Sequence, residues 1–147
     1  MDDKEGKELA DIPKKGEPAS EWRQDIPNTF VNEFGVLDLE DKTIRGVHVE
    51  LHVFKSPRLS QPRYRFSLYK LIGRHPERAY QQEINCRPGI KPTDHQYSHE
   101  HYGETIRNVA DGSWAYSDFD AALKRFCEKC NLTLIGNVPD ILEFKLK

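Results

Sequence analysis

Residues 43–54, TIRGVHVELHVF, decide the fold because apolar and polar side chains alternate along them. The apolar side chains stand at every second position: Val47, Val49, Leu51 and Val53. Successive side chains of a strand point to opposite faces, so this period of two predicts a strand with one apolar face. The intervening His48, Glu50 and His52 would then share the opposite face.

Two more strands are predicted directly downstream. Residues 63–71 place Tyr64, Phe66 and Leu68 on one side of a strand. Residues 78–86 predict a third strand, and the turn at residues 73–77 pairs it with the second as an antiparallel hairpin. Two short apolar segments near the end of the chain predict final strands, at residues 132–135 and 141–146.

One helix is predicted over residues 118–130. Its apolar side chains recur at helical spacing: Phe119, Ala122, Leu123, Phe126 and Cys130. Ser117 is a candidate N-cap, and Asn131 can end the helix in a left-handed conformation. Strands, then a helix, then strands predict an α+β domain, built as a small antiparallel sheet packed by one main helix in the C-terminal half.

The first 28 residues differ in composition from the rest of the chain. They mix acidic and basic side chains with Pro13, Gly16, Pro18 and Pro27, and they offer few apolar anchors. This composition predicts an acidic, disordered tail over residues 1–28 and a single domain over residues 29–147. Trp22 is the exception, because a lone Trp in a polar segment often docks on the domain or on a partner.

The composition also bears on the compartment. No stretch reaches the roughly 20 apolar residues that a membrane span needs, and the N-terminus lacks a signal-peptide pattern. Three cysteines do not make a disulfide framework, and Cys127 and Cys130 lie at the end of the predicted helix rather than at a helix start. We therefore expect a cytoplasmic protein with no membrane partner, whose cysteines serve packing.

Charge is distributed unevenly along the chain. Residues 51–90 hold eight Lys or Arg residues against Glu77 and Glu83, a balance of +6, although the whole chain carries −2. A basic segment can attract a polyanion such as RNA, and it can equally be a solvated face that meets acidic residues of its own chain.

Residues 91–104, KPTDHQYSHEHYGE, hold three of the six histidines within seven positions: His95, His99 and His101. Imidazole binds transition metals and transfers protons near neutral pH. Residues two apart on an extended chain share a face, so His99 and His101 can reach one ion or one substrate. Nearby carboxylates could orient the imidazoles, namely Asp94, Glu100 and Glu104. Whether the set around His48 and His52 joins this cluster is left open by the sequence.

Several segments resemble the TumE-like proteins, small bacterial toxin components of toxin–antitoxin systems. The similar segments are residues 63–69 (RYRFSLY), 83–87 (EINCR), 91–103 and 116–126, within a resemblance that spans residues 44–131. The compact Asp-His-x-His-x-Gly of that family is stretched here into residues 94–103. The resemblance implies a toxin-like protein with a neutralising antitoxin partner, and RNA is the commonest target of such toxins.

Three functional hypotheses follow. In the first, a ribonuclease-like toxin uses His95, His99 and His101 as general acid or base. Its phosphate-binding residues would be basic side chains on or after the strands: Arg63, Arg65, Arg87 and Lys91. In the second, a small cupin-like protein binds a divalent metal through the same three histidines. In the third, a non-enzymatic interaction module binds a protein partner through the acidic tail with Trp22.

Overall fold

The computed structural model describes residues 1–55, 62–85, 98–108 and 118–140. Two helices lie in this part of the chain, α1 (Asp3–Asp11) and α2 (Phe119–Lys129). The strands are β1 (Lys14–Gly16), β2 (Arg23–Ile26), β3 (Thr29–Leu37), β4 (Thr43–Phe54), β5 (Arg63–Ile72), β6 (His75–Asn85), β7 (His99–Tyr102), β8 (Thr105–Asn108) and β9 (Leu132–Leu134). Predicted residues 141–146, like His95, Arg87 and Lys91, lie outside the described residues.

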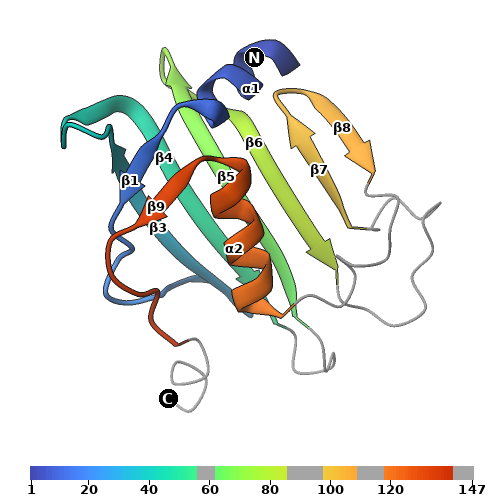
Figure 1. Cartoon of the computed structure of the whole chain (residues 1–147). Coiled ribbons are helices and arrows are strands. Elements are labelled where there is room, and N and C mark those ends of the chain that lie inside the picture. The colour runs from blue at the N-terminus through green and yellow to red at the C-terminus, as the bar shows by residue number, and fades with distance from the viewer. Residues whose placement is uncertain (56–61, 86–97, 109–117, 141–147) are drawn as a thin grey trace.

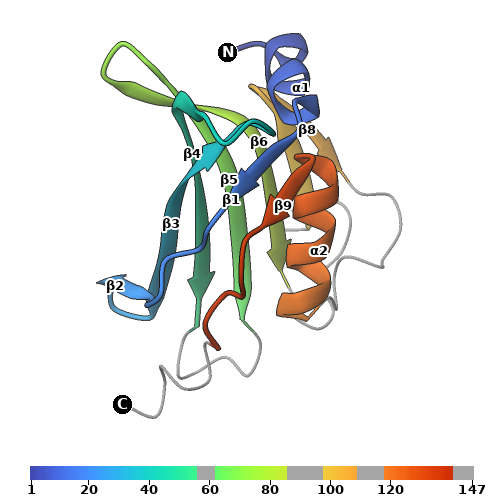
Figure 2. The ribbon, with the colours of Figure 1, turned by 60° about the vertical axis from the view of Figure 1, so that its left-hand side comes forward.

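The described strands form one curled sheet, a half-barrel, in the order β8-β7-β6-β5-β4-β3-β1-β9, with β2 paired to β3 (Figures 1 and 2). Every pair from β3 to β8 is antiparallel, whereas β1 and β9 are parallel. The expected fold, a small antiparallel sheet packed by one main helix, is therefore wrong. The sheet also includes β1, β2 and β8, which are short and carry no apolar run, so propensity gives little sign of them.

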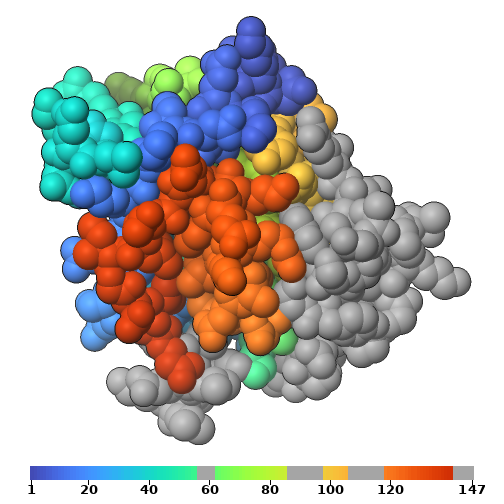
Figure 3. All heavy atoms as spheres, viewed as in Figure 1, coloured from blue at the N-terminus to red at the C-terminus, as the bar shows by residue number. Residues whose placement is uncertain are grey.

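The apolar core lies on the face of the sheet that α2 covers, here called the inner face (Figures 1 and 3). Val49 and Leu51 on β4 pair across the sheet with Leu68 and Phe66 on β5, and all four are fully buried. Phe126 of α2 packs edge-on against Phe66, with ring centroids 5.9 Å apart. The period of two predicted for residues 43–54 is confirmed, because its apolar positions build this core.

Residues 1–28 carry regular structure in place of the predicted disorder. Helix α1 begins after Asp2, whose carboxylate accepts from the Glu5 amide, and packs on the end of β6 and β7. The contact is close, since a Cβ on Gly6 would come within 2.4 Å of the Ala79 carbonyl oxygen. Trp22 is buried, and its indole Nε1 donates to the Pro139 carbonyl at 2.9 Å. Three of the few apolar residues of this segment, Leu9, Ala10 and Trp22, are thus buried and anchor it.

Lys14 joins the two ends of the chain. Its ammonium is buried and donates to the carbonyl of Ala10 in the last turn of α1 and to the carbonyl of Cys130 at the end of α2. Carbonyls at a helix C-terminus carry partial negative charge, so one cation caps two helices at once. Asn131, with a φ of 49°, ends α2 in the expected left-handed conformation and donates its side-chain amide to Asp11.

Helix α2 begins one residue later than predicted. Its N-cap is Asp118, whose side chain accepts from the Ala121 amide at 2.7 Å. Within the described residues, no helix combines the length and apolar character needed to cross a membrane.

Replacing Lys14 by Met should lower the free energy of unfolding at pH 7 by about 1–3 kcal/mol, because two buried carbonyls lose their donor. Burial lowers the pKa of Lys14 from 10.5 to about 8 in the folded protein. Between these values the unfolded chain binds more protons at this residue, so the stability of the wild type rises with pH relative to Lys14→Met. Urea unfolding at several pH values tests this, and a gap that does not widen from pH 8 to 10.5 would contradict it.

Candidate metal centre

The candidate site lies on the face of the sheet opposite α2, here called the outer face. The antiparallel register pairs Glu83 of β6 with His99 of β7, and Gln81 with His101. Residues two apart on one strand share a face, so Glu83, His99 and His101 project together. The expectation that His99 and His101 share a face is confirmed.

The three side chains converge closely. One donor atom from each of Glu83, His99 and His101 lies within 4.8 Å of the others. Nε2 of His99 is 2.6 Å from Oε2 of Glu83, and the two imidazole centroids are 4.8 Å apart. The His99 side chain is 11% exposed and that of Glu83 is 24% exposed, so solvent reaches the carboxylate while most of the imidazole surface is covered.

Arg65 of β5 fixes the carboxylate from the other side. Its Nε donates to Oε1 of Glu83 at 2.7 Å, while His99 holds the second oxygen. The hydrogen bonds from His99 and Arg65 lower the pKa of Glu83 to about 2, against the opposing effect of burial. Glu83 is therefore a carboxylate at neutral pH, held in one orientation and charged.

His101 differs from its neighbour in having an unpaired nitrogen. The residue is 6% exposed, and its Nδ1 is buried without a hydrogen-bond partner among the described residues. Burial, and then the positive charge of Arg78, lower the pKa of His101 to about 4. The imidazole is therefore neutral at pH 7 and keeps a lone pair, the form that a metal ion requires.

The structure separates other predicted site residues from this group. Glu100, expected to orient an imidazole, lies on the inner face, where it accepts from the Tyr80 hydroxyl at 2.9 Å. His48 and His52 share the outer face with His99, yet β5 and β6 lie between them. They form a set of their own with Glu50.

Of the predicted phosphate-binding residues, Arg63 and Arg65 lie in the described part of the chain, and both make other contacts. Arg65 is held by Glu83, so a phosphate would have to displace a charge-assisted hydrogen bond. Arg63 is exposed, with its guanidinium carbon 4.7 Å from the ring centroid of Phe54. The sequence does not single out Glu83 as a site residue, because only the pairing of β6 with β7 brings it beside His99.

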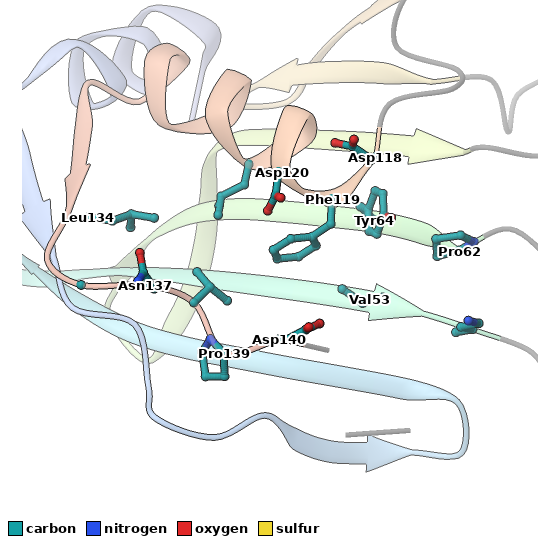
Figure 4. Close-up of a pocket in the computed structure, with 14 residues that line it drawn as sticks. Val53, Pro62, Tyr64, Asp118, Phe119, Asp120, Leu134, Asn137, Pro139 and Asp140 are labelled. Atoms are coloured by element: carbon teal, nitrogen blue, oxygen red, sulfur yellow. The ribbon is translucent and has the colours of Figure 1, made fainter. Parts of the chain in front are cut away.

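A cavity of about 730 Å³ lies elsewhere, between α2, the ends of β4 and β5 and the segment after β9 (Figure 4). Its walls combine the side chains of Tyr64, Phe119 and Leu123 with three acidic ones, those of Asp118, Asp120 and Asp140. Because Tyr64 pairs with Val53 on the inner face, this cavity and the histidines lie on opposite faces of the sheet.

Comparison of the chain with protein-family models, with curated proteins and with solved structures finds no match. The resemblance to the TumE-like proteins stays a prediction. The geometry of the described side chains is therefore the basis for a function.

His101 should stay neutral down to about pH 4, which the ¹⁵N shifts of its ring nitrogens in an NMR titration will report. In the unfolded chain its pKa returns to about 6.5. Between pH 6.5 and 4 the unfolded state binds more protons at this residue, so it makes the folded protein less stable as the pH falls. An imidazole that titrates near 6.5 in the folded protein would contradict the burial described above.

Proposed function

We propose that this chain is a metal-binding protein whose centre consists of Glu83, His99 and His101. The observation that carries the proposal is the convergence of three donor atoms within 4.8 Å, one of them on a neutral, buried imidazole with an unpaired nitrogen. Buried polar atoms are nearly always hydrogen-bonded, and one that is not calls for a partner such as an ion or water.

The donor set suits a transition metal. Two imidazoles and one carboxylate are ligands for Zn²⁺ or Fe²⁺, and they leave coordination positions for water or a substrate. Metal-bound carboxylates are commonly held by a further hydrogen bond, a role that Arg65 fits through its contact with Glu83.

A bound ion would replace a proton. The distance of 2.6 Å between His99 Nε2 and Glu83 Oε2 is that of a short hydrogen bond in which the imidazole N–H donates to the carboxylate. Ligand atoms about 2.0–2.2 Å from one ion lie roughly 3–3.5 Å from each other, so the two side chains separate slightly when the proton leaves. Metal uptake should therefore release protons and weaken as the pH falls.

Calorimetric titration of the chelator-treated protein with Zn²⁺ tests the centre directly. The wild type should take up the ion and melt at a higher temperature with it, whereas His101→Gln and Glu83→Gln should bind at least about tenfold more weakly. His75→Gln is the matched control, because it removes an exposed histidine at the tip of the β5–β6 hairpin. Unchanged affinity in both site variants, with melting transitions intact, would reject the proposal.

A toxin-like activity on RNA is a second proposal, favoured by the pairing of His99 with Glu83. A carboxylate that orients an imidazole is the arrangement of a general base, and exposed Arg63 lies two residues from Arg65 on the same strand. A toxin of this kind would have a protein antitoxin as its partner. It would act in the cytoplasm, and the free thiols of Cys127 and Cys130 are consistent with that compartment.

The two proposals differ in their need for metal. If His99 acts as a general base, RNA cleavage by the purified chain persists in excess EDTA and is lost in His99→Gln, while His75→Gln cleaves like the wild type. Cleavage that EDTA abolishes and Zn²⁺ restores would instead assign the chemistry to the metal centre. RNA left intact by the wild type under both conditions removes the toxin-like proposal.

A further inference from the structure

A second group of histidines and carboxylates lies on the outer face, on strands β3 and β4. The register sets Glu33 of β3 directly opposite Glu50 of β4, on the same face as His48 and His52. Like charges placed directly opposite each other on neighbouring strands destabilise a sheet. A cation held between Glu33 and Glu50 would remove this repulsion.

The geometry already brings the donors together. Nε2 of His48 lies 2.9 Å from Oε2 of Glu50 and 3.9 Å from Oε1 of Glu33. One donor atom from each of these three residues lies within 4.8 Å of the other two. His52 approaches the remaining oxygen of Glu50 at 3.0 Å, as a residue that orients a metal-bound carboxylate does.

Neighbouring side chains hold the group in place. The His48 ring stacks on Tyr69 of β5, with centroids 5.4 Å apart and planes inclined by 26°. The side chains of His48 and Glu50 are each 20% exposed, whereas that of Glu33 is 43% exposed. Arg23 approaches Glu33 at 3.7 Å across the surface and competes for it. The arrangement is thus preorganised on β4 and open to solvent on β3.

We propose that Glu33, His48 and Glu50 bind a second divalent ion of the Zn²⁺ or Mn²⁺ class. This site offers two carboxylates and one imidazole, whereas the first centre offers one carboxylate and two imidazoles. The second donor set is therefore the harder one, which favours these ions over softer ones. Exposure of Glu33 and competition from Arg23 make this site weaker than the one at Glu83. The second site lies on β3 and β4 and the first on β6 and β7, with β5 between them. The two sites share no ligand, so this inference does not depend on the first centre.

Equilibrium dialysis of the chelator-treated full chain against Zn²⁺, with metal analysis, counts the ions. The wild type and His75→Gln should hold two per chain, with His101→Gln and His48→Gln holding one each. The ion that His48→Gln retains should be the more tightly bound one, at Glu83, His99 and His101. Two ions retained in His48→Gln, or a single ion in the wild type that His101→Gln removes, would overturn the inference. If the first centre alone is wrong, the wild type holds one ion that persists in His101→Gln and is lost in His48→Gln.

The variant Glu33→Gln distinguishes the loss of metal binding from the loss of the fold. The change is isosteric and lies on an exposed side chain, and it removes the like-charge pair, so the metal-free variant should melt no lower than the wild type. Its Zn²⁺ affinity at the second site should nevertheless fall about tenfold or more. Unchanged affinity in a stably folded Glu33→Gln protein would equally overturn the inference.

Discussion

The antiparallel register of β4, β5, β6 and β7 is the constraint on which the rest of the structure depends. It sets Leu51 against Phe66 on the inner face, and Glu83 against both Arg65 and His99 on the outer face. A shift of any strand by one residue would exchange these two sets of side chains. The apolar core therefore holds the site in place, because the burial that stabilises one face fixes which polar groups meet on the other.

The two faces of the sheet perform different tasks. The inner face is closed by α2 and by the segments at the two ends of the chain, which Lys14 and Trp22 fasten to each other through hydrogen bonds to backbone carbonyls. The outer face carries two histidine–carboxylate groups on either side of a hydrogen-bonded pair, in which Gln81 donates to Ser67 at 2.8 Å. In the adjacent row of the sheet, Arg65 stands between His52 of one group and Glu83 of the other.

The same residue types reach different states in the two groups. Glu83 is held on one oxygen by Arg65 and on the other by His99, which together lower its pKa, and it lies beside a buried, neutral His101. Glu50 is bonded by two imidazoles, which lower its pKa, and faces a second carboxylate. Position in the sheet, rather than residue type, thus separates a compact three-donor centre from a more solvent-exposed one.

The sequence by itself determined the strands β4, β5 and β6, the helix α2 and the shared face of His99 and His101, because each depends on a local period of two or 3.6 residues. The partners of those histidines were decided only by the tertiary structure. Glu83 meets His99 through strand pairing, and His48 is kept from His101 by two intervening strands. The tertiary structure also decided that the N-terminal segment is ordered. Lys14 is buried against carbonyls at the ends of two helices that lie more than a hundred residues apart in the chain, and no local sequence pattern indicates this contact.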